Sequence, residues 1–165
     1  MDKMMDKIAS FTIDHLKLLP GIYVSRKDQA GDSLITTFDI RMTRPNYEPV
    51  LNTAEIHTIE HLGATYLRNH DSMKDHVIYF GPMGCRTGFY LLVRSMTPQE
   101  VHDLIVETLE AIVAYNGPMP GAARKECGNF KCLSLADAKA ECAAYLPVAA
   151  AQPLDFAYPK GADLT

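Results

Sequence analysis

Four short segments of the chain concentrate apolar, β-branched and aromatic residues in the pattern of β-strands. Two of them, 22–25 and 33–42, are separated by a Gly-Asp turn. The other two, 76–80 and 86–94, are joined by a Gly-Pro-Met-Gly-Cys corner. Because tight connections join neighbouring strands in opposite directions, the pattern predicts antiparallel pairs.

Apolar residues recur at helical spacing in two longer segments. The first covers residues 52–69, where Asn52 can cap the helix and Glu55 can complete a capping box. The second begins at Thr97-Pro98, a cap followed by a proline in the first turn, and ends at an Asn-Gly-Pro sequence.

A third, shorter helix is predicted over residues 134–145, with Ser134 as its cap. Prolines and glycines predict an irregular tail at 146–165, so the expected core of the domain is 10–145. The element order β-β-α-β-β-α-α predicts a single α+β domain. In it, an antiparallel β-sheet is covered by helices on one face.

The composition agrees with one globular domain. The 165 residues are 47% hydrophobic and 22% charged, and a chain of this length buries roughly 70% of its unfolded surface. The net charge of -4 argues against nucleic acid and anionic membranes as partners. Residues 1–8 lack the apolar core of a signal peptide, and no apolar run is long enough for a membrane span. We therefore expect a cytoplasmic protein whose four cysteines are free thiols or ligands.

The sharpest chemical signal is the sequence His57-Thr58-Ile59-Glu60-His61. Residues four apart share one face of a helix, so the two imidazoles can bind one metal ion with the carboxylate beside it. They lie opposite the predicted apolar stripe of this helix. The alternative is that both histidines are ordinary surface residues.

An open metal site of the catalytic type needs a third protein ligand. Spacing alone leaves this choice open, although Cys127 lies in a turn-forming stretch and Cys142 is expected in the core. The candidates are Cys85, Cys127, Cys132, His15, His70 and His76. The His-x-x-Glu-His order also occurs in inverted zincin metallopeptidases, where Glu60 would activate water against a peptide carbonyl.

Cys85 occupies a second position of chemical interest. Glycines on both sides of it allow a sharp backbone turn and a close ligand. One interpretation is that Cys85 provides a nucleophilic or basic thiol. The other is that it is a buried cysteine that fills the turn.

Taken together, these segments resemble one known family, S-ribosylhomocysteine lyase (LuxS). The resemblance covers residues 10–145 and includes the metal-type histidines and both chemically interesting cysteines. In chain order the matching segments are Ser10-Phe11-Thr12-Ile13-Asp14-His15, Phe38-Asp39-Ile40-Arg41, His57-Thr58-Ile59-Glu60-His61-Leu62, Pro82-Met83-Gly84-Cys85-Arg86-Thr87-Gly88-Phe89-Tyr90 and Glu126-Cys127-Gly128-Asn129.

The resemblance implies cleavage of S-ribosylhomocysteine to homocysteine and 4,5-dihydroxy-2,3-pentanedione, the precursor of the quorum-sensing signal autoinducer-2. The same step recycles the product of methyl-transfer reactions. It further implies one divalent metal per subunit, Fe2+ with Zn2+ or Co2+ as substitutes, and a homodimer with its sites at the interface. Three sets of residues carry the implied roles: His57, His61 and Cys127 as metal ligands, Cys85 and Glu60 as the acid/base pair, and Ser10, His15 and Arg41 as substrate contacts.

The chemistry explains why such a set is needed. The thioether becomes a feasible leaving group only after the sugar carbonyl has migrated to C3 through two enolisations. Each enolisation needs a Lewis acid on the oxygens and a base that moves a proton between neighbouring carbons. Two alternatives remain at this level, a zinc metallopeptidase and a metal-binding homologue without catalysis.

One residue and one three-residue segment depart from the pattern of many family members. Thr37 stands where a lysine often precedes Phe-Asp-Ile-Arg, and Tyr79-Phe80-Gly81 replaces Asp-Ile-Ser before Pro-Met-Gly-Cys. Both changes remove charge from the expected substrate rim and leave the metal and acid/base groups untouched. We therefore expect rearranged substrate contacts and retained activity.

Overall fold

The computed structural model describes residues 5–162. The outermost residues of the predicted N-terminal segment and tail, 1–4 and 163–165, lie outside this range. Within residues 5–162 the chain forms a four-stranded antiparallel sheet in the order β1-β2-β4-β3 and three α-helices, which confirms the predicted single α+β domain. The elements are η1 (Ala9–Phe11), β1 (Gly21–Ala30), β2 (Ser33–Arg41), α1 (Thr53–Asn69), η2 (Lys74–His76), β3 (Val77–Pro82), β4 (Gly88–Arg94), α2 (Pro98–Ala114) and α3 (Leu135–Ala150).

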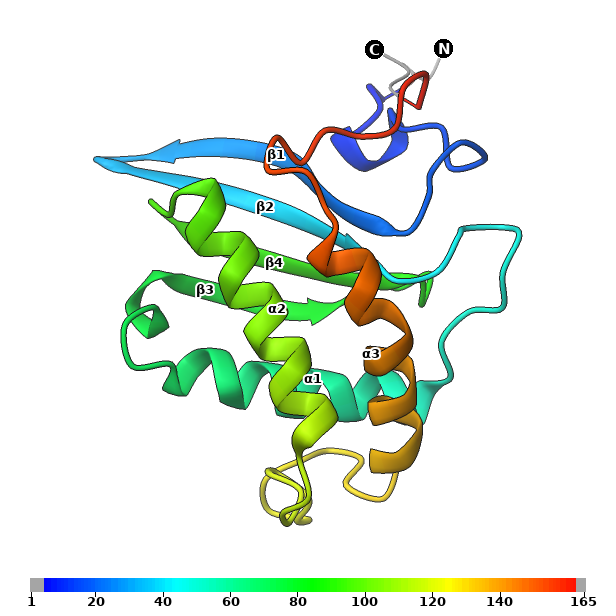
Figure 1. Cartoon of the computed structure of the whole chain (residues 1–165), viewed down its shortest axis with the longest axis vertical. Helices are drawn as coiled ribbons and strands as arrows, with labels where there is room; N and C mark the ends of the chain where they lie inside the picture. The colour runs from blue at the N-terminus through cyan, green and yellow to red at the C-terminus, as the bar shows by residue number, and fades with distance from the viewer. Residues whose placement is uncertain (1–4, 163–165) are drawn as a thin grey trace.

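Strand register divides the sheet into two faces of different character. Ile22, Ile40 and Phe89 form one cross-strand row and point to the helix layer, where all three are buried. Figure 1 shows α2 and α3 crossing in front of this face. The adjacent row, with Asp39 opposite Tyr90, points to the other face because successive side chains of a strand alternate.

Local signals explain both long helices. Asn52 accepts a hydrogen bond from the Glu55 backbone N–H, and the Glu55 carboxylate accepts one from the Asn52 backbone, as the sequence predicted. Thr97 and Glu100 form the same reciprocal pair at the start of α2. Each such cap satisfies two otherwise unpaired backbone donors.

Several element boundaries differ from the prediction. β1 runs to Ala30 because its outer half, although polar and exposed, continues to pair with β2. β4 begins at Gly88, since Arg86 has a positive φ of 61° and belongs to the corner. The third helix continues through Pro147 to Ala150, so the predicted irregular structure of 146–150 is wrong. Burial of Ala149 and the bond from the Ala151 N–H to the Pro147 carbonyl hold its last turn.

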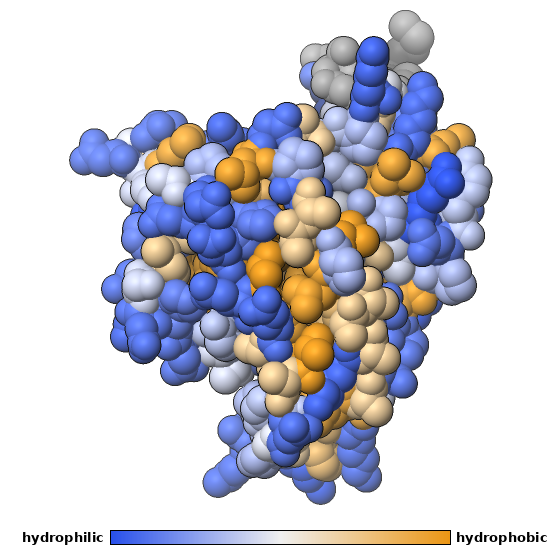
Figure 2. Space-filling model, viewed as in Figure 1, coloured by the Kyte–Doolittle hydropathy of each residue, from blue (hydrophilic) through white to orange (hydrophobic). Residues whose placement is uncertain are grey.

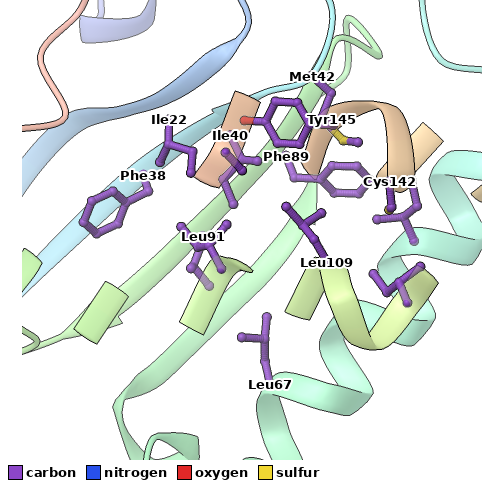
Figure 3. Packing of buried hydrophobic residues seen from close by; sticks show 14 of the residues in the cluster. Ile22, Phe38, Ile40, Met42, Leu67, Phe89, Leu91, Leu109, Cys142 and Tyr145 are labelled. Atoms are coloured by element: carbon purple, nitrogen blue, oxygen red, sulfur yellow. The ribbon is translucent and has the colours of Figure 1, made fainter. Parts of the chain in front are cut away.

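One hydrophobic core lies between the sheet and the helices (Figure 3). Leu91 from β4, Leu109 from α2, and Cys142 and Tyr145 from α3 meet in it. Cys142 is fully buried, as expected. On the helix-covered surface, hydrophobic side chains gather in a band over α2 and α3, with polar residues on both sides (Figure 2). Within residues 5–162, no helix is long and apolar enough to cross a membrane.

Candidate metal centre and active site

Helix α1 presents His57 and His61 on the side away from its buried stripe. Ile56 and Ile59 are buried against the core, whereas both histidines are half-buried. The imidazole centroids lie 4.4 Å apart with the rings nearly perpendicular. Glu60, also half-buried, stands between them in the sequence. The two imidazoles therefore lie side by side on one face of the helix, as their spacing predicted.

Cys127 joins the two histidines from the loop between α2 and α3. Its Sγ lies 3.2 Å from His57 Nε2, and one ligand atom from each of the three residues falls within 4.8 Å of the others. Ligands of a tetrahedral site with bonds near 2.0–2.3 Å are about 3.3–3.8 Å apart. The three side chains therefore need only a small adjustment to surround one ion. Cys85, Cys132, His15, His70 and His76 are not members of this cluster.

Backbone carbonyls fix the orientation of both imidazoles. His57 Nδ1 lies 2.7 Å from the Cys132 carbonyl oxygen, and His61 Nδ1 lies 2.8 Å from that of Pro120. A carbonyl oxygen can only accept, so each Nδ1 carries the proton and each Nε2 keeps its lone pair. This is the arrangement that a metal-ligating histidine requires. The donor set, two imidazoles and a thiolate, suits Zn2+, Fe2+ or Co2+.

Gly121 allows the Pro120 carbonyl to approach His61. It has a positive φ of 70°, and a Cβ there would lie 2.9 Å from His61 Nδ1. We expect Gly121→Ala to displace this support and lower metal affinity by about 10–100-fold, the usual cost of losing such a partner. Competition with a chelator measures this loss. Gly128→Ala is the matched control, because no atom lies within 4 Å of its added Cβ, and equal affinities in the two variants would contradict the prediction.

Cys85 belongs to a second cluster, on the corner between β3 and β4. Its exposed thiol lies 3.1 Å from Thr87 Oγ1. The Arg41 guanidinium donates to Thr87 Oγ1 over 2.8 Å, and the same Nη1 lies 3.9 Å from Cys85 Sγ. Arg41 is 4% exposed, whereas Cys85 is exposed.

Asp39 holds the other branch of this guanidinium. Its Oδ2 accepts from Arg41 Nη2 over 2.7 Å, and both side chains are buried. Asp39 and Thr87 were not predicted as site residues, although both lie inside motifs that match the family. The signal for Asp39 was available, because it stands two residues before Arg41 on a strand and so shares its face. A buried aspartate on that face needs a cationic partner.

Two expected substrate contacts lie in the N-terminal segment. Ser10 is in η1, and His15 Nδ1 bonds to the Ile13 carbonyl over 2.8 Å. In Figure 1 this segment is at the opposite end of the molecule from the loop that carries Cys127. One chain therefore does not bring Ser10 and His15 to the metal-ligand cluster.

The two departures from the family pattern meet across strand β4. Thr37 and Tyr79 both pair with Leu92, one from β2 and one from β3. The Tyr79 hydroxyl lies where a side chain on Gly81 would be, so glycine at 81 makes room for this ring. Thr37 shares the sheet face of Arg41, because the two residues are four positions apart along β2.

The α+β fold and the two-histidine, one-cysteine cluster define a class, namely small single-domain proteins with three side chains placed to hold one metal ion. The family model S-Ribosylhomocysteinase (LuxS) matches residues 8–153. The chain therefore belongs to the S-ribosylhomocysteinase (LuxS) family.

Curated relatives agree with this assignment. The S-ribosylhomocysteine lyase of Clostridium acetobutylicum is 58% identical over 79% of this chain and 84% of its own length. That of Finegoldia magna is 57% identical over 87% of this chain and 92% of its own length. The S-ribosylhomocysteine lyase of Clostridium beijerinckii is 55% identical over 82% of this chain and 86% of its own length. The metallopeptidase alternative is not favoured by any of these matches.

Proposed function

We propose that this protein is a metal-dependent lyase that cleaves S-ribosylhomocysteine to homocysteine and 4,5-dihydroxy-2,3-pentanedione. The observation that carries the proposal is the His57, His61 and Cys127 cluster, with both Nδ1 atoms engaged, in a chain of this family. The relatives named S-ribosylhomocysteine lyase support the same substrate.

The metal ligands of the proposal are His57, His61 and Cys127. A divalent metal held there, Fe2+ with Zn2+ or Co2+ as substitutes, would supply Lewis-acid stabilisation of the negative charge that develops on the sugar oxygens. The backbone carbonyls of Cys132 and Pro120 keep the imidazoles in place for this purpose.

Cys85 serves as the carbon base. Its thiolate takes a proton from one sugar carbon and returns it to the next in each of two enolisations, and the final β-elimination expels the homocysteine sulfur. Arg41 and Thr87 support this role, because they place a positive charge and a hydroxyl beside the Cys85 sulfur. Glu60, on the same helix as both histidines, moves protons among the sugar hydroxyls.

Substrate binding requires a second subunit in this proposal. Ser10, His15 and Arg41 are the substrate contacts, but the N-terminal segment that carries Ser10 and His15 lies at the opposite end of the molecule from the loop between α2 and α3 (Figure 1). In a homodimer, the N-terminal segment of one subunit could reach the metal-ligand cluster of the other subunit, which would bring the substrate contacts and the metal ligands together. The sheet face opposite the helices supports such a dimer, because Ile35, Leu92 and Tyr90 on it are only half-buried and Tyr79 is exposed.

In the cell, the same reaction would recycle the product of methyl-transfer reactions and supply the precursor of the autoinducer-2 signal. We place the protein in the cytoplasm, because its four cysteines are free thiols. A reducing compartment also keeps Cys85 and Cys127 available for chemistry and metal binding.

The decisive experiment is thiol release. Protein loaded with Fe2+ under anaerobic conditions should release one free thiol for each S-ribosylhomocysteine consumed, and removal of the metal with a chelator should abolish the release. A peptide substrate should remain intact in the same preparation. Metal-loaded protein that releases no thiol would overturn the proposal, and peptide hydrolysis would favour the metallopeptidase.

A further inference from the structure

The chain after α3 wraps around the edge strand β1. Gln152 accepts a hydrogen bond from the Ile22 N–H over 2.9 Å, and the Phe156 carbonyl accepts one from the Val24 N–H over 2.9 Å. Further on, the Ala162 carbonyl accepts from the Asp14 N–H. The bonds from Ile22 and Val24 occupy backbone donors that an edge strand would otherwise leave unpaired. Residues 152–162 thus form a strap, which Figure 1 draws in orange to red along β1.

Side chains of the strap reach both faces of the sheet. Phe156 is 2% exposed and packs edge-to-face on Phe38, on the helix side, with centroids 5.1 Å apart. Tyr158 lies on the other face, where its ring stacks on Tyr23 at 4.8 Å. Its hydroxyl donates to Asp39 Oδ2 over 2.9 Å. The strap therefore passes from the core to the face that carries Arg41.

Asp39 connects Tyr158 to the Cys85 cluster. Its Oδ2 accepts from both Tyr158 and Arg41, whereas its buried Oδ1 has no hydrogen-bond partner within residues 5–162. Tyr158 thus supplies one of the two bonds that orient this carboxylate. Burial, followed by the nearby charge of Asp39, raises the pKa of the Tyr158 hydroxyl, which therefore stays protonated and donates at any physiological pH.

We propose that Tyr158 is a positioning residue that acts through Asp39 to hold the Arg41 guanidinium against Thr87 and Cys85. This inference rests on the proposed function, in which Cys85 is the base and Arg41 contacts the substrate. Tyr158 lies outside the residues 8–153 that the family model matches and outside the five motifs quoted above. Its hydroxyl fixes Asp39, Asp39 fixes one branch of the guanidinium, and the other branch lies at the Cys85 sulfur.

Alkylation of Cys85 tests this inference without any substrate. Tryptic cleavage places each of the four cysteines on a different peptide, so mass spectrometry follows Cys85 separately in iodoacetamide-treated, metal-loaded protein. Burial raises the pKa of the Cys142 thiol to about 12, and its peptide therefore serves as an unmodified standard.

Tyr158→Phe keeps the stacked ring and removes only the hydroxyl. We expect it to slow Cys85 alkylation and to lower kcat/KM by about 3–10-fold, a typical size for coupling through such a network.

Tyr23→Phe is the matched control. It removes a hydroxyl from the other ring of the same stack, but that hydroxyl donates to the Leu19 carbonyl and not to Asp39. We expect Tyr23→Phe to lower the melting temperature of the protein. Its rate of Cys85 alkylation should stay within twofold of the wild-type rate. Equal slowing in Tyr23→Phe and Tyr158→Phe would show general loosening and overturn the inference, as would an unchanged rate in Tyr158→Phe.

A double-mutant comparison tests the route through Asp39. In an Asp39→Asn background, Tyr158→Phe should have no further effect on alkylation, whereas a full additional effect would overturn the route. If Asp39→Asn does not fold, the single variants still decide. Failure of the proposed function is a separate result, because it appears as wild-type protein that releases no thiol from S-ribosylhomocysteine.

Discussion

Cys85→Ala should reduce turnover of S-ribosylhomocysteine by about 10²–10⁴-fold, the contribution of one well-placed acid/base group. We expect the upper part of this range, because the proposed mechanism uses the same thiolate in both enolisations. Metal content should not change, since Cys85 is not a member of the His57, His61 and Cys127 cluster. Initial rates of thiol release and metal analysis of the same sample provide the two measurements.

Cys132→Ala is the control for this prediction. The Cys132 side chain makes only a long contact of 3.8 Å with Thr53, and its support of His57 comes from the backbone carbonyl, which alanine retains. This variant should keep both metal and most of its turnover. Unchanged turnover in Cys85→Ala would show that Cys85 only fills the corner, and would leave the chain as a metal-binding homologue without this chemistry.

His61→Ala should empty the metal site. Loss of a supporting hydrogen bond to a ligand already costs about 10–100-fold in affinity, so loss of the ligand itself should cost at least about 10²-fold. The variant should lose its metal on dialysis and its turnover with it. The helix should persist, because His61 is a half-buried residue in the middle of α1, away from the capping box at Asn52 and Glu55.

His70→Ala provides the comparison from the end of the same helix. His70 contacts Glu107 over 2.9 Å and is not a member of the cluster. The His70→Ala variant should retain its full metal content after the same dialysis. Full occupancy in His61→Ala would disprove the proposed ligand set, and loss of metal from both variants would indicate damage to α1 in general.

Local sequence signals predicted most of the fold because they act over a few residues. A capping box depends on residues three apart, as at Asn52 and Glu55, and a strand is recognised from its alternation. The prediction failed where context overrode these signals. The exposed outer half of β1 has no apolar alternation, yet β2 supplies its hydrogen bonds. Pro147 normally indicates a helix end, but burial of Ala149 continues α3 beyond it.

The sequence by itself determined the pair of histidines, because helical periodicity places residues 57 and 61 on one face whatever surrounds them. Spacing left six candidates for the third member, and only the family resemblance implied Cys127. Tertiary structure brings Cys127 to His57 from 70 residues away in the sequence. The carbonyls that orient both imidazoles also come from that distant loop. In the same way, strand register and the path of the chain after α3 bring Cys85, Arg41, Asp39 and Tyr158 together. Such contacts depend on how distant elements pack against one another, and short-range patterns in the sequence do not predict that packing.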